Sequence, residues 1–196
     1  MVSIRLVVAR YNEDVSWTKR YANVTIYNKG LPISGYDNVI NLPNVGREGH
    51  TFYTHIVLNY DNLDDFTIFL QGNPFDHTKD IFAKLDELSS NSLQNINFCY
   101  ISDNILECNL VECKHHKGLP LRKVFNQLFF NGYPYFSYKF PQGAQFGVSK
   151  NRILRRGRRF YQKIINLLSK QKNPIEGFVI ERFHGLIFHD LFLKGN

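Results

Sequence analysis

The sequence predicts an α/β fold with a mostly parallel central sheet flanked by helices. Three observations predict it. Short apolar runs of the buried-strand type alternate with segments of helical periodicity, polar clusters follow two of those runs, and 43% of the 196 residues are hydrophobic. Alternation of strands and helices is typical of parallel sheets, because parallel neighbours need a long crossover connection. No linker or repeat divides the chain, so we expect residues 1–196 to form a single domain.

Apolar runs bounded by turn residues predict the strands. They are Ile4–Ala9, Val24–Tyr27, Phe66–Leu70, Ile96–Ile101 and Gln145–Val148. Apolar residues spaced three and four apart predict the helices, because that spacing places them on one helical face. The expected helices span about 15–21, 52–60, 81–88, 121–129, 151–170 and 179–193. Asn12 or Asp14 would cap the first helix, and Asp76 would cap the third.

The charge of the chain predicts an anionic partner. The net charge is +7 and the isoelectric point is near 9.3, which nucleic acid, acidic lipid, phosphorylated substrates and nucleotide sugars would all complement. The mean hydropathy of −0.29 and the lack of any apolar run near the roughly 18 residues of a membrane span exclude a membrane-embedded protein. Arg5 and Arg10 interrupt the opening segment, so we expect a strand instead of a signal peptide, and a cytoplasmic location.

The cysteines are few and odd in number. They are Cys99, Cys108 and Cys113. From this number we expect that the protein has no disulfide scaffold and that it lies in a reducing compartment. Because His115 and His116 lie close to Cys113 in the sequence, a zinc site is an alternative. The spacing of these residues matches no standard zinc motif. We expect buried free thiols.

Two polar loops follow buried strands, and both contain carboxylates. Arg10–Asp14 follows the first strand and Gln71–His77 follows the third. In open α/β sheets, ligands bind beyond the carboxyl ends of the strands, so these loops are the predicted site. The simpler alternative is that their side chains only cap helices or pair with one another. The chain contains no P-loop, nucleophile elbow, metalloprotease or dinucleotide-binding motif.

Glu181 and His184 lie three residues apart, so they share one face of the last expected helix. Apolar residues between Phe178 and Phe188 indicate that this helix is buried. A buried carboxylate is costly unless it has a partner, which favours a functional role. Glu181 could be a general base and His184 a ligand of metal or phosphate. The alternative is a structural ion pair between Glu181 and Arg182 or a lysine.

Four segments together form a familiar pattern. They are Val7-Val8-Ala9-Arg10-Tyr11-Asn12-Glu13, Asp65-Phe66-Thr67-Ile68-Phe69-Leu70-Gln71-Gly72-Asn73, Gly143-Ala144-Gln145-Phe146-Gly147-Val148-Ser149-Lys150 and Glu181-Arg182-Phe183-His184. This pattern resembles nucleotide-sugar-dependent glycosyltransferases of the type A fold. Nearly the whole chain, including Asp76-His77, also resembles an uncharacterised family with members in fungi and large DNA viruses.

The resemblance implies a Rossmann-like domain that transfers a sugar from a nucleotide diphosphate sugar to a glycan or another hydroxyl acceptor. The residues that would hold the nucleotide and its diphosphate are Arg10, Asn12, Glu13, Asp14, Gln71 and Asn73. A Mn²⁺ or Mg²⁺ ion would be bound by Asp76, His77 and His184, and Glu181 would be the catalytic base.

One segment departs from the pattern. Type A enzymes usually carry Asp-x-Asp after the metal strand, whereas this chain has Gln71-Gly72-Asn73. Amide oxygens ligate Mg²⁺ or Mn²⁺ without charge, so we expect a lower metal affinity. Asp76 and His77 could supply the missing ligands. Alternatively, no metal is used and cationic side chains hold the diphosphate.

Two further segments leave alternatives open. Residues 150–172 contain many Arg and Lys and no acid, which predicts a solvated helix face, a cationic wall near the diphosphate, or a surface for nucleic acid or membrane. The aromatic segment 133–140 would cover the core or stack on sugars or bases. The alternative functions are an inactive glycan- or nucleotide-binding module of the same fold and a basic nucleic-acid-binding protein, of which nucleic acid binding is the less favoured.

Overall fold

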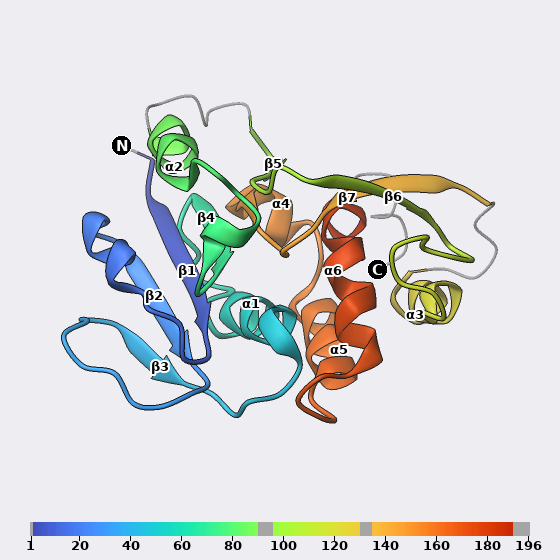
Figure 1. The fold of residues 1–196 in the computed structure, drawn as a ribbon, viewed down its shortest axis with the longest axis horizontal. Helices are drawn as coiled ribbons and strands as arrows, with labels where there is room; N and C mark the ends of the chain where they lie inside the picture. The colour runs from blue at the N-terminus through green and yellow to red at the C-terminus, as the bar shows by residue number, and fades with distance from the viewer. Residues whose placement is uncertain (1, 90–95, 130–134, 190–196) are drawn as a thin grey trace.

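A six-stranded sheet is the centre of the protein, as shown by a computed structural model that describes residues 2–89, 96–129 and 135–189 (Figure 1). Its strands are β1 Ile4–Arg10, β2 Val24–Asn28, β3 Val39–Asn41, β4 Phe66–Gln71, β5 Phe98–Tyr100 and β8 Phe146–Ser149. The spatial order is β3-β2-β1-β4-β8-β5. β3, β2, β1 and β4 are parallel, and β8 is antiparallel to both of its neighbours. The predicted mixed α/β fold with a mostly parallel sheet is confirmed.

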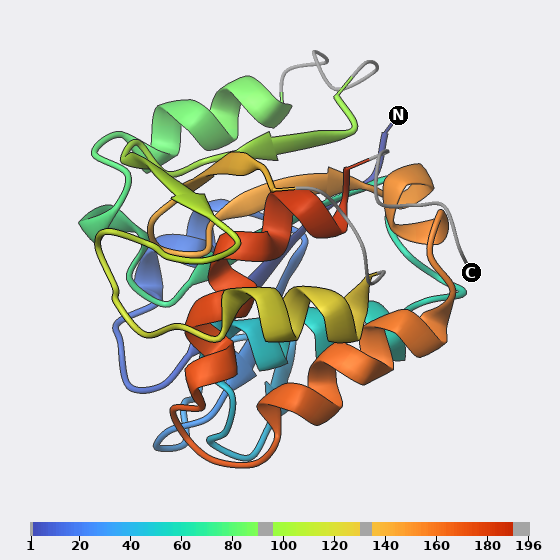
Figure 2. The ribbon, with the colours of Figure 1, turned by 90° about the vertical axis from the view of Figure 1, so that its right-hand side faces the viewer.

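Helices cover both faces of the sheet (Figures 1 and 2). They are α1 Arg47–Leu58, α2 Ile81–Ser89, α3 Leu121–Leu128, α4 Lys150–Leu154, α5 Arg158–Leu168 and α6 Ile175–Ile187, with 3-10 helices η1 Ser16–Arg20 and η2 Pro74–Asp76. α1, α3, α5 and α6 contribute to one core, whereas α2 packs on the opposite face with η1. Among the described residues, no helix combines the length and apolar character that a membrane crossing requires.

Successive side chains of β1 enter two different cores. Val7 and Ala9 belong to the core that includes residues of α1 and α6, and Leu6 and Val8 belong to the core that includes residues of α2. Burial on both faces explains why Leu6–Ala9 within this strand is a continuous apolar run in the sequence. The larger core is aromatic. The ring of Phe69 on β4 lies 5.1 Å from Phe52 on α1 and 5.0 Å from Phe146 on β8.

Several elements differ from the prediction. Strand β3 and the two-stranded ribbon of β6 Ile105–Asn109 and β7 Ser137–Pro141 were not predicted. The basic helix expected over 151–170 is interrupted around Gly157 and forms α4 and α5. The last helix begins at Ile175, earlier than expected, and its expected end at Leu193 lies outside the described residues, as do Tyr133 and Pro134 of the aromatic segment.

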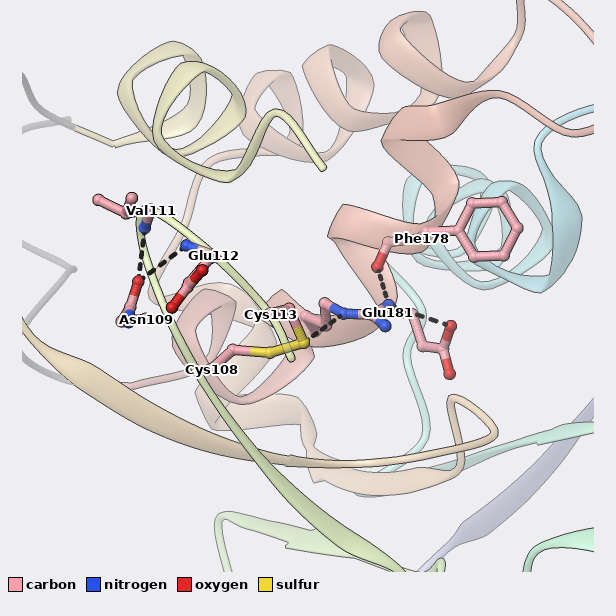
Figure 3. Close-up of a disulfide and its surroundings, with 8 residues drawn as sticks. Cys108, Asn109, Val111, Glu112, Cys113, Phe178 and Glu181 are labelled. Atoms are coloured by element: carbon pink, nitrogen blue, oxygen red, sulfur yellow. Dashed lines mark hydrogen bonds and ion pairs between the residues drawn. A yellow bond between two sulfur atoms is a disulfide. The ribbon is translucent and has the colours of Figure 1, made fainter. Parts of the chain in front are cut away.

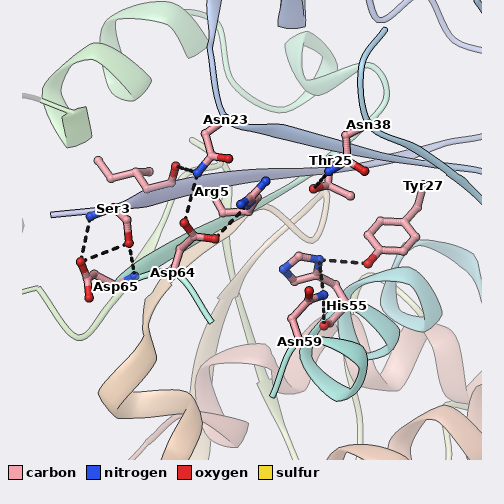
Figure 4. A network of polar contacts seen from close by, with 11 residues as sticks. Ser3, Arg5, Asn23, Thr25, Tyr27, Asn38, His55, Asn59, Asp64 and Asp65 are labelled. Carbon is pink, nitrogen blue, oxygen red and sulfur yellow. Dashed lines mark hydrogen bonds and ion pairs between the residues drawn. The ribbon is translucent and has the colours of Figure 1, made fainter. Parts of the chain in front are cut away.

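Polar side chains at the amino ends of β1 and β2 pair with the turn before β4 (Figure 4). Arg5 Nε donates to Asp64 Oδ2 at 2.8 Å, and Asn23 Nδ2 donates to Asp64 Oδ1 at 3.1 Å. The backbone N–H and the hydroxyl of Ser3 both donate to Asp65 Oδ2. We call Ser3, Arg5, Asn23, Asp64 and Asp65 the amino-edge network, and it fastens the start of β1 to β4.

The prediction of free thiols at Cys108 and Cys113 is wrong, because these residues form a disulfide (Figure 3). The side chain of Asn109 explains why these two cysteines lie close together. Its Oδ1 accepts from the backbone N–H groups of Val111 and Glu112 at 2.7 and 2.9 Å, and this turn reverses the chain. The two cysteine Cα atoms are consequently 4.7 Å apart, within the range for a disulfide. Cys99 is free, as predicted.

Candidate functional site at the carboxyl edge of the sheet

The two polar loops predicted from the sequence leave the sheet side by side. β1 and β4 are parallel neighbours, with Ala9 opposite Gln71. β2 is the other parallel neighbour of β1, with Arg10 opposite Asn28. Strands that run in the same direction end at the same edge, so the segments after β1, β2 and β4 meet there. We call these segments, with the residues that contact them, the carboxyl edge.

Arg10 is buried at this edge and holds the surrounding backbone. Its Nη1 donates to Asn28 Oδ1 at 2.6 Å and to the carbonyl of Leu31 at 3.0 Å. Its Nε donates to the carbonyl of Glu13 at 3.0 Å. Because these partners come from β2, from the segment after β2 and from the loop after β1, Arg10 holds these three segments together from within.

Asn12 and Asp14 also use their side chains within the loops. Asn12 Oδ1 accepts from the backbone N–H of Leu31 at 2.9 Å. Asp14 accepts from the backbone N–H and the hydroxyl of Ser16 at 2.9 and 2.8 Å, which lowers the pKa of Asp14. Both side chains stay exposed, so these hydrogen bonds orient them at the surface.

Glu13 connects the loop after β1 with the loop after β4. Its Oε2 accepts from the backbone N–H of Tyr11 at 2.6 Å. The carboxylate lies against Gly72, where an added Cβ would be 2.6 Å from Oε2. Only glycine at this position permits the approach. The Gly72 carbonyl accepts from Trp17 Nε1 at 3.0 Å, which ties η1 to the same loop.

The loop after β4 leads to a tight contact with the turn between β7 and β8. Gln71 Nε2 donates to the Asn73 carbonyl at 2.7 Å. Asp76 is exposed at the end of η2. The ring of His77 packs on Gly143, where an added Cβ would be 2.4 Å from its Cδ2. Gly143 has a φ of +90°, a second reason why the turn needs glycine.

Glu181 reaches the same turn from α6. Its Oε1 accepts from the backbone N–H of Gly143 at 3.0 Å, and its Oε2 lies 3.8 Å from Arg182 Nη1. The Glu181 side chain is 16% exposed, so the carboxylate is half-buried and reaches solvent. The structure therefore brings Glu181 and His77 together against Gly143.

His184 faces the core instead. Its Nδ1 is hydrogen bonded to the Tyr53 hydroxyl at 2.8 Å, and its ring centroid lies 4.6 Å from that of Phe146. Burial lowers the pKa of His184 to about 3. In the part of the chain that the structure describes, no three His, Cys, Asp or Glu side chains gather in a way that could hold a metal ion. The predicted set of Asp76, His77 and His184 is thus not brought together.

Lys29 is a residue of this edge that the sequence analysis did not single out. Its Nζ donates to the carbonyls of Val45 and Arg47 at 2.7 and 2.6 Å. Burial lowers the pKa of Lys29 to about 8, and the Glu48 carboxylate opposes that shift. Lys29 directly follows β2, so the rule that selected the other two loops would also have selected this one.

The backbone is strained at two places along this edge. Arg47 and Ala144 have φ values of 52° and 51°, which are uncommon for residues other than glycine. Arg47 begins α1 and places its guanidinium 4.2 Å over the ring of Phe178 on α6. Ala144 follows Gly143 in the turn that holds Glu181. Strained residues of this kind concentrate at functional sites, since the surrounding structure must enforce them.

These contacts join the segments of the carboxyl edge to one another in a ring. Its successive contacts are Glu13 with Gly72, His77 with Gly143, Gly143 with Glu181, Phe178 with Arg47, Arg47 with Lys29, and Lys29 with Arg10. Segments distant in the sequence consequently present two carboxylates, an imidazole and several cations at one edge.

Sizeable cavities lie in other parts of the molecule. One of about 310 Å³ is lined by Tyr21 and Tyr36 among others. Two of about 510 and 330 Å³ share Phe98, Gly185 and His189 near β5 and the end of α6. None of these three is lined by a predicted site residue.

The fold and the site place the protein in the class of open α/β sheet proteins with polar loops after adjacent parallel strands. Residues 6–193 match the family described as "Protein of unknown function (DUF3431)", and the chain belongs to that family. No curated protein and no solved structure matches the chain.

Proposed function

We propose that the protein is a glycosyltransferase of the type A kind that moves a sugar from a nucleotide diphosphate sugar to a hydroxyl acceptor. The observation that carries the proposal is the position of Glu181. Its carboxylate accepts from Gly143 N–H at 3.0 Å, and His77 of the loop after β4 packs on the same glycine. If the diphosphate binds beside that loop, the base that deprotonates the acceptor hydroxyl must lie near the diphosphate. Glu181 meets this requirement, because it contacts the same glycine as His77.

The loop after β1 is suited to the nucleoside. Tyr11 is 43% exposed, and Lys172 Nζ lies 4.7 Å over its ring. The carboxylate of Glu13 is an acceptor for ribose hydroxyl groups, and its contact with Tyr11 N–H holds it in place. Arg10 supports the loop from beneath through its buried hydrogen bonds.

Cationic side chains would stabilise the leaving diphosphate. Gln71 and Asn73 are uncharged, and the acids and imidazoles expected to bind metal are not gathered among the described residues. In the proposed mechanism, cationic side chains therefore take the role of a metal ion. As the bond between the sugar C1 and the diphosphate oxygen breaks, negative charge develops on that oxygen, and Arg47 and Lys172 would offset it. Lys29 positions Arg47 by binding its carbonyl.

Glu181 would take the proton from the acceptor hydroxyl while that oxygen attacks C1. Gly143 holds one carboxylate oxygen, so the carboxylate is oriented before the acceptor arrives. A positioned general base typically contributes 10²–10⁴-fold to the rate, or about 3–5 kcal/mol.

The test is a screen of UDP and GDP sugars, with and without Mn²⁺, in which calorimetry measures nucleotide binding and product analysis measures donor hydrolysis and transfer. We expect Glu181→Gln to lower turnover about 10²–10⁴-fold with nucleotide affinity retained. Glu176→Gln, on the first turn of the same helix, is the matched control and should keep full turnover. If neither nucleotide binds, or if Glu181→Gln is fully active, the proposal is wrong.

A binding module that holds a nucleotide or glycan without turnover is a second candidate. The uncharged sequence Gln71-Gly72-Asn73 favours it, because this is where type A enzymes usually carry their acidic motif. Nucleotide binding without hydrolysis or transfer of any donor in the screen would support this candidate over the enzyme. Preferential binding of RNA or DNA with a steep salt dependence would support a nucleic-acid-binding protein instead.

A further inference from the structure

We propose that the outer face of α5 docks on the surface of a bilayer that contains anionic lipids. The exposed residues of this face are Arg158, Arg159, Gln162, Lys163, Asn166 and, directly after the helix, Lys170. We call these six residues the basic face. The inference goes beyond the proposed transferase activity and does not depend on it, because the basic face contains none of the residues assigned to that reaction.

The helical period separates the basic face from a buried face. Residues four apart lie on the same side of a helix, as Arg159 and Lys163 do. The buried side chains of the same helix are Phe160, Tyr161, Ile164 and Leu168, and they belong to the core that includes residues of α1 and α6. α5, orange in Figure 2, lies at the periphery of the molecule, so the basic face points to solvent.

The cations of the basic face oppose the stability of their own helix. Arg158 and Arg159 are the first two residues of α5, where the helix dipole favours anions and disfavours cations. Arg159 and Lys163 are like charges four residues apart, which repel each other on a helix surface. No Asp or Glu occurs between residues 150 and 172 to offset them. Side chains that oppose local stability are expected where they serve binding, and an anionic partner would reduce both repulsions.

Most of this positive charge is not neutralised within the protein. Arg158 pairs with Asp61. Arg159, Lys163 and Lys170 make no ion pair with any residue that the structure describes. Three cations on one exposed surface therefore remain available to the phosphate and carboxylate groups of anionic lipids, to which basic clusters on helices bind.

Exposed aliphatic side chains lie near the basic face. Leu154, four residues before Arg158, is 40% exposed. Leu58 is 63% exposed and lies two residues before Tyr60, whose ring centroid is 5.2 Å from the Arg158 guanidinium. Cations with aliphatic neighbours fit the interface of an anionic bilayer, because its charged headgroups lie directly above an apolar interior.

Nucleic acid fits the basic face less well. Phe160 and Tyr161, the aromatic residues of α5, are 7% and 0% exposed, so neither ring can stack on an unpaired base. Gln162 and Asn166 are amides of the kind that read base edges, but Gln162 Nε2 donates to Asn166 Oδ1 at 3.1 Å. The face therefore offers charge and aliphatic contact without a means of base recognition, which favours lipid as the partner.

The test is sedimentation of the protein with vesicles of phosphatidylcholine, alone or with about 30% phosphatidylserine, at low and high salt. We expect binding to the anionic vesicles only, and weaker binding at high salt. Arg159→Gln with Lys163→Gln should lower the affinity for anionic vesicles about 10–30-fold, since each cation near such a surface contributes about fivefold. The thermal unfolding midpoint of this variant should equal or exceed that of the wild type, because the repulsion within α5 is removed.

The matched control is Lys19→Gln with Lys79→Gln, which removes the same charge on the other side of the sheet. Lys19 lies on η1 and Lys79 precedes α2, and both are exposed. These elements pack on the face of the sheet opposite to α5. We expect the control to bind anionic vesicles like the wild type. An equal loss of affinity in both double variants would show general attraction by the net charge and would overturn the inference.

Two further outcomes would also overturn it. One is the absence of binding to anionic vesicles at low salt, or equal binding to the uncharged vesicles. The other is preferential binding of duplex DNA or RNA that is lost in the variant of Arg159 and Lys163, which would assign the basic face to nucleic acid. Vesicle binding is measured without nucleotide, so its failure leaves the proposed transferase untouched, and failure of the nucleotide screen leaves the docking surface standing.

Discussion

The two edges of the central sheet are both polar, but their polar groups are satisfied in different ways. At the amino edge, Asp64 is paired with the side chains of Arg5 at 2.8 Å and Asn23 at 3.1 Å, and Asp65 accepts from both the backbone N–H and the hydroxyl of Ser3 (Figure 4). At the carboxyl edge, the carboxylates of Glu13 and Glu181 are held by backbone N–H groups, at 2.6 and 3.0 Å. A carboxylate fixed by the backbone is oriented, but its charge is not cancelled by that partner.

Backbone strain follows the same division. Within residues 2–89, 96–129 and 135–189, the non-glycine residues with positive φ are Arg47 and Ala144, and both lie on the carboxyl edge. An unusual conformation of this kind costs about 1–3 kcal/mol and must be enforced by surrounding contacts. This difference favours a stabilising role for the amino edge and is consistent with the binding role that we propose for the carboxyl edge.

Acid should destabilise the protein most, through buried histidines. Burial lowers the pKa of His50 and His55 to about 4, so both are neutral in the fold while the unfolded chain binds protons below about pH 6.5. Stability is then fully present above that pH and is lost as pH falls towards 4, by about 3 kcal/mol per histidine. Denaturant unfolding across this range measures it.

Two matched variants test whether buried histidines cause the loss of stability in acid. His55→Gln should reduce the loss of stability between about pH 6.5 and 4 by about 3 kcal/mol, the share of one histidine, whereas His115→Gln, at an exposed position, should leave it unchanged. Equal pH dependence in both variants and the wild type contradicts the assignment. His55 is hydrogen bonded to the Tyr27 hydroxyl and interacts with Arg5 and Asp64 of the amino-edge network, so its share of the effect belongs to the stabilising side of the comparison. His50 interacts with Lys29 of the carboxyl edge.

Gly143→Ala should be the most damaging single change at the carboxyl edge. The new Cβ would lie 2.4 Å from His77 Cδ2 at a φ of +90°, so we expect a loss of about 2–3 kcal/mol and displacement of His77. Chemical denaturation measures the first effect, and NMR of the His77 ring the second. Gly118→Ala, also at positive φ but with open space around it, controls for backbone strain alone. Equal losses in both variants would contradict the role of the His77 contact.

Asp64→Ala should affect stability alone. It removes the partner of Arg5 and of Asn23, and the two side chains of the ion pair are 26% and 17% exposed. We expect a loss of about 1–2 kcal/mol in the free energy of unfolding. Nucleotide affinity should match the wild type in calorimetry. A variant of normal stability with impaired nucleotide binding would reverse the roles of the two edges.

Lys172→Ala should have the smallest effect on stability and a selective effect on binding. Lys172 is exposed and contacts the ring of Tyr11, so unfolding should change by less than about 0.5 kcal/mol. UDP affinity should fall about threefold to tenfold at low salt, and less at high salt. Lys163→Ala, at an exposed position of α5, should bind UDP normally; an equal loss there points to general electrostatic attraction.

The sequence was sufficient to predict β1, β2, β4, β5 and β8 of the central sheet, but not the short strand β3 or the ribbon of β6 and β7. Ile4–Ala9 and Phe66–Leu70 are apolar on both faces, so composition alone marks them. Strand β3 has only three residues, and β6 alternates exposed and buried side chains, so neither forms an apolar run. The disulfide was missed because the turn that joins its cysteines depends on the side chain of Asn109.

The candidate site was predicted in part. The rule on strand ends placed Glu13 and His77 on one edge, and the pattern around Glu181 marked it as a costly buried acid. The meeting of Glu181 and His77 depends on Gly143, a tertiary contact that no local pattern encodes. His184 shares the helix with Glu181, but its ring packs against Phe146 in the core, which spacing alone could not distinguish.

The central claim is that nucleotides bind at the carboxyl edge of the sheet. Titration of ¹⁵N-labelled protein with UDP and GDP tests it most directly, with the backbone amides as reporters. We expect the largest shifts at Tyr11, Glu13, Gly72 and Gly143. Shifts confined to the amino-edge network or to the cavities near Phe98 and His189, or no shifts at millimolar nucleotide, would contradict the claim.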